Sequence, residues 1–145
     1  MITPVWVRWS YPGETIGAMD GKAHHERPVA TQPEDLSRMV VERLNAGDVE
    51  GLAALYEPHA TLALPGGRTA TGTDQIRAAY QRLLADRPRF EPGEQLPTLR
   101  SGELAMTSTR LTNGAVTAEV ARRQPDGTWL WVLDQPNVSA PRQAP

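Results

Sequence analysis

The chain has 145 residues, no cysteine, 39% hydrophobic and 22% charged residues, and a net charge of −2. This length fits a single domain with a sizeable core, and the lack of cysteine excludes disulfides, cysteine nucleophiles and thiolate metal sites. The slight negative charge gives no electrostatic reason to expect nucleic acid or an anionic membrane as a partner, and no apolar run approaches the roughly 20 residues of a membrane span, so we expect a cytoplasmic protein.

The first 31 residues differ from the rest of the chain. Trp6 and Trp9 lie in a short apolar stretch that proline and glycine then interrupt, and polar residues follow. We expect residues 1–31 to form an arm that is flexible or packs on a neighbouring surface. The pair His24-His25 has no third ligand at a recognisable spacing, so we predict no metal site, and no cofactor-binding motif is present.

Three helices are predicted next. The first covers residues 33–47, with proline and two acidic residues in its first turn and a glycine at its end. Asp48 suits the N-cap of a shorter second helix, which Pro58 stops. The third covers residues 74–86, where Tyr80 belongs to the apolar stripe.

Strand patterns dominate the rest of the chain. Gly66-Gly67, Asn113-Gly114 and Pro125-Asp126-Gly127 are turn sequences between strands. The predicted strands cover residues 60–65, 68–71, 90–100, 103–112, 115–124 and 128–135. This order predicts an α+β fold, in which a cone-shaped, curved, antiparallel-rich sheet wraps around three helices of the N-terminal half and encloses a conical cavity. We assign residues 32–138 to this domain and residues 139–145 to a Pro-rich tail.

The last strand is apolar on both faces. Strict alternation places Leu130, Val132 and Asp134 on one face and Trp129, Trp131 and Leu133 on the other. We expect the face with Asp134 to line the cavity. The other face then needs a cover, so we predict a homodimer through Trp129, Trp131 and Leu133.

Several stretches carry a family resemblance. They are residues 45–52 (Asn-Ala-Gly-Asp-Val-Glu-Gly-Leu), 55–61 (Leu-Tyr-Glu-Pro-His-Ala-Thr), 72–80 (Gly-Thr-Asp-Gln-Ile-Arg-Ala-Ala-Tyr) and 123–129 (Arg-Gln-Pro-Asp-Gly-Thr-Trp). From about Pro33 to Val138 the chain resembles the nuclear transport factor 2-like (NTF2-like) superfamily, which includes ketosteroid isomerases and SnoaL-like polyketide cyclases. Its members include enzymes, subunits without catalytic activity and binding modules, so the resemblance implies a fold more firmly than a reaction.

The resemblance carries over only some functional residues. The general base of ketosteroid isomerases falls on Leu64, and the tyrosine of their oxyanion hole falls on Val40. Their protonated aspartate falls on Glu119. The resemblance therefore implies no steroid isomerisation by that mechanism. In SnoaL-like cyclases an acid-base aspartate lies in the cavity near the chain end, and Asp134 is its plausible counterpart.

Glu119 and Asp134 are the candidate acid-base residues. With the turn at residues 125–127, paired residue numbers sum to about 252, which places Glu119 opposite Leu133. A bulge that shifts the register by one would bring both carboxyls into one cavity, where an apolar lining would raise at least one pKa. Otherwise Asp134 caps the strand end, and Glu119 forms a salt bridge with Arg110 or Arg122.

Further candidates complete the predicted site. His59 is either an acid-base partner or a loop histidine bonded to backbone, and Tyr80 either donates into the cavity or belongs to the core. Cavity-lining positions are assigned to the residues Tyr80, Val40, Leu64, Val132 and Leu62.

Two functions follow from this site. The first is a SnoaL-like small-molecule enzyme, of isomerase, cyclase or lyase type, doing cofactor-free acid-base chemistry on an apolar ligand that contains a carbonyl. The second is a non-catalytic ligand-binding or assembly module that keeps only the cavity. A buried carboxyl pair with a raised pKa favours the first, and a cavity filled by the chain's own side chains favours the second.

Overall fold

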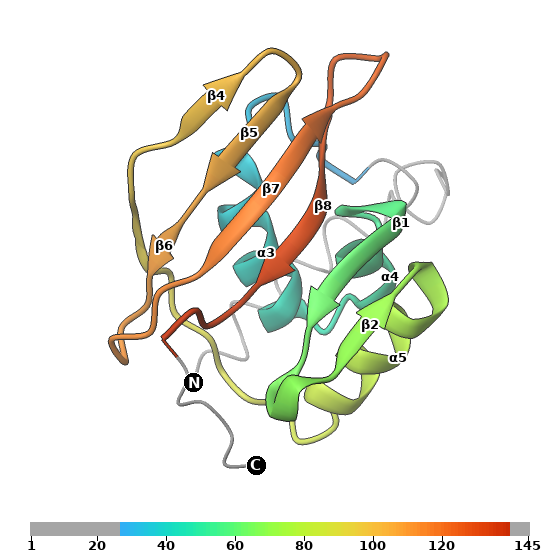
Figure 1. The fold of residues 1–145 in the computed structure, drawn as a ribbon. Helices are drawn as coiled ribbons and strands as arrows, with labels where there is room; N and C mark the ends of the chain where they lie inside the picture. Colours follow the sequence, from blue (N-terminus) through green and yellow to red (C-terminus); the bar gives the residue numbers. More distant parts are fainter. Residues whose placement is uncertain (1–26, 140–145) are drawn as a thin grey trace, which may run out of the picture.

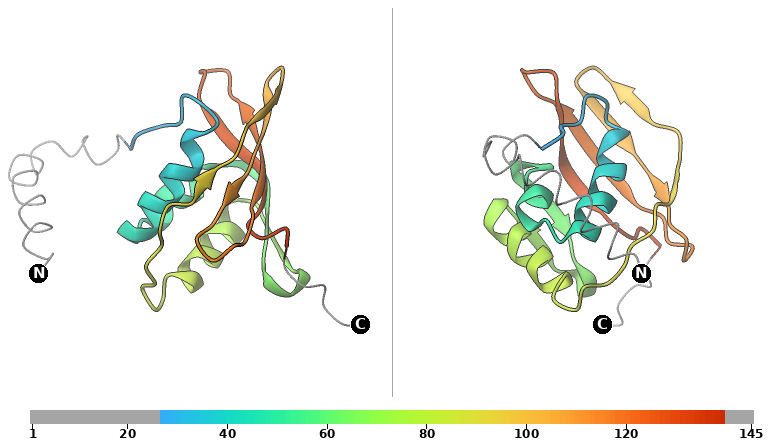
Figure 2. Two further views of the ribbon diagram at one scale, coloured as in Figure 1. Left: turned by 90° about the vertical axis from the view of Figure 1, so that its left-hand side faces the viewer. Right: turned by 180° about the vertical axis from the view of Figure 1, so that it is seen from behind.

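The computed structural model describes residues 27–139, so most of the predicted arm, the pair His24-His25 and most of the tail lie outside it. Three helices cover one face of a curved sheet (Figures 1 and 2). The helices are α3 (Asp35–Ala46), α4 (Val49–Ala53) and α5 (Thr73–Leu83). The strands are β1 (Tyr56–Ala63), β2 (Thr69–Thr71), β3 (Glu94–Gln95), β4 (Leu99–Ser101), β5 (Leu104–Thr107), β6 (Thr109–Arg110), β7 (Ala118–Arg123) and β8 (Trp129–Gln135).

The main sheet has six strands in the order β2-β1-β8-β7-β5-β4, and β3 pairs separately with β6. Every neighbouring pair is antiparallel except β1 and β8, which run parallel. Figure 1 shows β7 and β8 in the middle of this sheet, with α3 behind them. The predicted α+β class and the cone-shaped arrangement of helices and sheet are confirmed. Among residues 27–139, the helices are too short or too polar to span a lipid bilayer.

The boundary between the first two helices lies where its capping residues predict, although α4 already ends at Ala53 and not at Pro58. Gly47 closes α3 with a φ of 68°, a left-handed conformation that glycine adopts without strain. The Asp48 carboxylate accepts a hydrogen bond of 3.0 Å from the Gly51 backbone N–H and so caps α4. These local signals fix how the chain turns from the first helix into the second.

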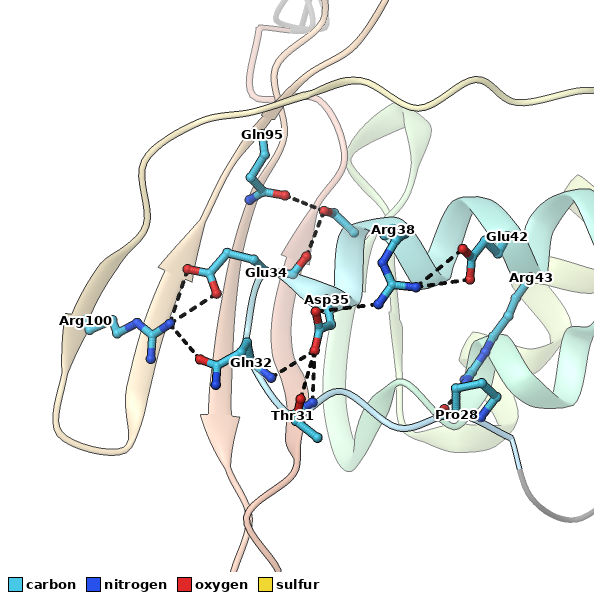
Figure 3. Close-up of polar contacts among 11 residues, drawn as sticks. Pro28, Thr31, Gln32, Glu34, Asp35, Arg38, Glu42, Arg43, Gln95 and Arg100 are labelled. Carbon is cyan, nitrogen blue, oxygen red and sulfur yellow. Dashed lines mark hydrogen bonds and ion pairs between the residues drawn. The ribbon is translucent and has the colours of Figure 1, made fainter.

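The beginning of α3 is tied to the edge of the sheet (Figure 3). The Asp35 carboxylate accepts bonds of 3.0 Å from the backbone N–H groups of Thr31 and Gln32. Arg100 of β4 donates to Glu34 at 3.1 Å. Because β4 is the outermost strand of the sheet, this ion pair connects the helix layer directly to the sheet edge.

Two strand predictions need correction. The first strand begins at Tyr56 rather than at residue 60 and includes Pro58. Proline is tolerated there because the pairing of β1 with β8 is irregular between Tyr56 and Thr61, so the missing backbone N–H breaks no regular ladder. The segment predicted as one strand over residues 90–100 forms only β3 and β4, because Pro92, Gly93 and Pro97 interrupt the ladder.

The alternation of β8 also differs from the prediction. Ala121 pairs with Trp131, but the next residue of β7, Val120, pairs with Leu133, so Val132 is an extra residue in β8. This bulge reverses the parity of the strand at its middle. Trp129 and Trp131 are therefore only 4% and 2% exposed and face the helices with the core. The prediction that they form an outer, dimerising face is wrong.

Candidate functional site

The bulge at Val132 brings the two candidate carboxylic acids together. Up to this point the predicted register holds, since Arg123 pairs with Trp129. Beyond it the register is shifted by one, and Glu119 lies directly opposite Asp134. Directly paired residues of neighbouring strands point to the same face, so both side chains turn toward the helices.

Asp134 is buried against two tyrosines. It is 8% exposed, and the Tyr56 hydroxyl donates to its Oδ2 at 2.5 Å. The hydroxyls of Tyr56 and Tyr80 lie 2.6 Å apart, so the three residues form one chain from β8 through β1 to α5. Burial raises the pKa of Asp134, and the facing Glu119 raises it further, to about 7, although the bond from Tyr56 acts in the opposite direction.

Glu119 is buried beside threonines. It is 4% exposed, and the Thr107 hydroxyl donates to its Oε1 at 2.7 Å. Burial raises the pKa of Glu119, while hydrogen bonds with Thr107 and Thr117 partly oppose that shift. Because Glu119 raises the pKa of Asp134, the two carboxyls titrate as a coupled pair. We infer that this pair releases its last proton near neutral pH.

Neither carboxyl has a basic partner within residues 27–139. Arg110 pairs with Glu94 and Arg122 with Glu57, each at 3.0 Å, so the predicted alternative of a salt bridge to Glu119 is not found. A buried carboxylate without a cation is costly in a low-dielectric interior, and the pair lowers that cost by keeping a proton. The arrangement therefore provides one acid and one base side by side.

Aromatic rings adjoin the carboxyls on the inner side. The centroid of the Tyr56 ring lies 5.4 Å from that of Trp131 and 6.2 Å from that of Tyr80. Of the described side chains, Trp131 keeps its indole Nε1 buried and without a hydrogen-bond partner. These rings fill the inner end of the sheet and exclude water from Asp134, which is the physical origin of its raised pKa.

The other predicted site residues are found at different depths. Leu62 is buried and pairs with Asp134 across β1 and β8. Val40 and Leu64 are half-buried against the core, and Val132 is half-buried in the bulge. His59 is an exposed residue of β1, and the structure does not bring it to the carboxyls.

Two contributors are not evident from the sequence. Tyr56 lies between Asp48 and Pro58, where the sequence predicts the second helix, but it begins β1 and bonds to Asp134. Thr107 lies opposite Glu119 on β5. The alternation of residues 105, 107 and 109 along a predicted strand is the one signal that would place its side chain inward.

A hollow of about 330 Å³ opens on the other face of the sheet. Thr61, Met106, Val120 and Leu133 line it on that face, and the hollow also reaches Glu119 and Asp134. Leu133 is 51% exposed and Met106 is 47% exposed. A conical cavity on the helix side of Asp134 stays a prediction, because the hollow described here lies on the opposite face of the sheet. No group of three potential metal-ligating side chains occurs between residues 27 and 139.

The chain belongs to the SnoaL-like domain family, which matches residues 37–135, and so to the NTF2-like superfamily. No curated protein matches it significantly. The resemblance to ketosteroid isomerases is thus a likeness within one superfamily, and the expectation that Leu64 and Val40 replace two of their functional residues stays a prediction.

Solved structures share the fold at low identity. A domain from Thiobacillus denitrificans, provisionally described as a calcium/calmodulin-dependent protein kinase type II association domain, has a TM-score of 0.63 and 20% identity over 75% of this chain and 96% of its own. A provisionally described NTF2-like dehydratase from Streptomyces avermitilis has a TM-score of 0.59 and 16% identity, over 72% and 92%. A ketosteroid isomerase-like protein from Erwinia carotovora atroseptica has a TM-score of 0.57 and 19% identity, over 74% and 94%.

Proposed function

We propose that this SnoaL-like chain is an enzyme that transfers protons on a small, apolar, carbonyl-containing compound without a cofactor. The observation that supports the proposal is the pair Glu119 and Asp134, buried face to face with no basic partner among the described residues. Perturbed carboxyls of this kind concentrate at active sites, where a catalytic pKa near the working pH is useful.

The reaction uses the single proton of the pair. The carboxylate member takes a proton from the carbon next to the carbonyl, and the C–H electron pair moves to form an enolate. The protonated member donates a hydrogen bond to the enolate oxygen, where negative charge develops. Return of the proton to a different carbon completes an isomerisation, and expulsion of a β-leaving group would complete a lyase reaction.

The ligand is proposed to contact half-buried apolar side chains that pack against the core. Val40 of α3 and Leu64 after β1 pack on the core while keeping part of their surface exposed. Leu62 and Tyr80 would form the deeper wall. His59, exposed on β1, is not part of this proposal.

Hydrogen–deuterium exchange tests the activity without knowledge of the natural substrate. A panel of cyclic ketones and enones is incubated in D₂O, and loss of the proton next to the carbonyl is followed by NMR. We expect the protein to accelerate exchange for at least one ketone, and Asp134→Asn to reduce that rate by about 10²–10⁴-fold.

Matched controls separate this chemistry from surface effects. Asp86→Asn and Glu103→Gln make the same change from carboxyl to amide at exposed positions and should leave exchange unchanged. Wild-type exchange no faster than buffer across the panel, or equal exchange by Asp134→Asn, would contradict the proposed activity.

A second candidate function is assembly, and the outer face of the sheet favours it. Leu133, Met106 and Leu99 expose apolar surface there around the hollow described above. The domain from Thiobacillus denitrificans that shares this fold is described as an association domain. We propose a homodimer that packs these outer faces together, with Leu133 at the interface but without Trp129 or Trp131.

Light scattering tests this interface. Leu133→Lys should convert a dimer to a monomer, because it places an unpaired charge in an apolar contact. Leu83→Lys changes an equally exposed leucine on α5 and should leave the mass unchanged. A wild-type protein that is monomeric at high concentration would contradict the proposed dimer.

A further inference from the structure

The chain of hydroxyls behind Asp134 has a fixed polarity when that carboxyl is ionised. A carboxylate oxygen only accepts hydrogen bonds, so Tyr56 must donate its single hydroxyl hydrogen to Oδ2, 2.5 Å away. The bond of 2.6 Å between the two phenols must then be donated by Tyr80. Both phenol hydrogens are thus directed toward the carboxylate, and each bond polarises the next.

This chain also leaves one oxygen of the Asp134 carboxyl available. Among the described residues, Tyr56 donates to Oδ2 of Asp134, and Oδ1 accepts no hydrogen bond from residues 27–139. Glu119, in contrast, is held by both Thr107 and Thr117. A ligand that meets Asp134 would therefore meet Oδ1, with Oδ2 already held.

We propose that Tyr56 is a positioning residue that holds Asp134 by Oδ2, leaves Oδ1 for the ligand, and sets the pH range over which the Glu119–Asp134 pair keeps its single proton. Tyr80 supports Tyr56 from α5. This inference rests on the proposed function for the role of the pair, but its effect on proton release can be measured without any substrate.

Only hydroxyl groups are placed to stabilise the ionised form of Asp134 among the described residues. The titratable groups that face it are Glu119 from β7, Tyr56 from β1 and Tyr80 from α5, and none of these is basic. Glu119 disfavours ionisation of Asp134, and burial does the same. The phenol of Tyr56 is the group in this cluster that favours the ionised form.

Removing the phenol oxygen isolates this effect. Tyr56→Phe keeps the ring that packs on Trp131 and removes the donor, so the carboxylate form of Asp134 loses its stabilising hydrogen bond. Tyr80→Phe removes only the donor to Tyr56. Thr61→Val deletes a hydroxyl on the outer face of the same sheet, where Thr61 contacts Thr71 at 3.2 Å, and serves as the matched control.

The direct readout is a carbon-13 NMR titration of the side-chain carboxyl signals assigned to Asp134 and Glu119. In Tyr56→Phe, the higher midpoint of the pair should move upward by about one pH unit. Tyr80→Phe should move it in the same direction by a smaller amount, and Thr61→Val should leave it unchanged. In the exchange assay, the pH optimum should move upward in the same order.

Unchanged midpoints in a folded Tyr56→Phe variant would overturn the proposal, and so would a downward shift. If Tyr56→Phe does not fold, Tyr80→Phe decides alone, since it retains Tyr56 and removes its donor: an upward shift supports the inference and no shift overturns it. Absence of exchange activity together with the expected shifts would contradict the proposed function while leaving the role of Tyr56 intact.

Discussion

Two rows of residues on the same four strands reverse the usual placement of side chains in a sheet, where the covered face is apolar and the exposed face is polar. Each residue of one row adjoins a residue of the other in the sequence, yet the rows face opposite sides. The inner row is covered by helices and includes two carboxyls, and the outer row is apolar except for Thr61 and is partly exposed. The inner row is Thr107, Glu119, Asp134 and Leu62, and the outer row is Met106, Val120, Leu133 and Thr61.

Exposed apolar residues that occur singly need no explanation, but buried carboxyls and neighbouring exposed apolar residues such as Leu133 and Met106 do. Folding alone would favour the reverse placement on both faces. The proposed functions account for both departures, with proton transfer at the inner row and contact with another copy at the outer row.

The largest expected difference between the faces concerns β8 itself. Trp131→Ala removes a fully buried ring from the core and should destabilise the protein by about 3–5 kcal/mol. Leu133→Ala, two residues further along on the outer face, should cost less than about 1 kcal/mol in the monomer. Urea denaturation of both variants measures the difference, and similar costs would contradict the parity change at Val132.

Asp134→Asn should stabilise the protein at alkaline pH. Its pKa rises from 3.8 in the unfolded chain to about 7 in the fold, so the native state binds the proton more tightly and stability falls as the pH rises between these values. Asparagine does not titrate and can still accept the bond from Tyr56. We expect a gain of about 2–4 kcal/mol at pH 8 that disappears below about pH 4.

Thermal denaturation as a function of pH measures this gain. Asp86→Asn, at an exposed position, serves as the control and should show no comparable dependence on pH. A destabilised Asp134→Asn at pH 8 would mean that the carboxylate makes favourable contacts that the described structure lacks.

The smallest expected difference compares two threonines. Thr107→Val removes the buried donor to Glu119 and should cost about 1–2 kcal/mol, because it leaves a buried acceptor without its partner. Thr61→Val on the outer row removes an exposed hydroxyl and should cost less than about 0.5 kcal/mol. Equal costs, again from urea denaturation, would remove the distinction between the rows at these strands.

Much of the fold could be predicted from local signals. Gly47 and Asp48 define the boundary between the first two helices, and the turn at Gly127 sets the register of the last hairpin as far as Trp131. Each of these signals acts within a few residues, so the sequence displays it directly.

The site could be predicted only in part. The residues around Val132 are apolar on both sides, so the sequence carries no contrast that would reveal a bulge or show which face is inward. The pairing of Glu119 with Asp134 depends on that bulge. Likewise Tyr56 satisfies both a helical stripe and a buried strand position, and only its contact with a residue 78 positions away distinguishes them.

Glu119 and Asp134 are expected to retain a single proton between them near neutral pH, and titration of their carboxyl carbons by NMR in the wild-type protein measures this. We expect two coupled midpoints, with the higher one at about pH 7 and absent in Asp134→Asn. Two independent midpoints below pH 5, at the values of exposed carboxyls, would show that the two groups do not form such a pair.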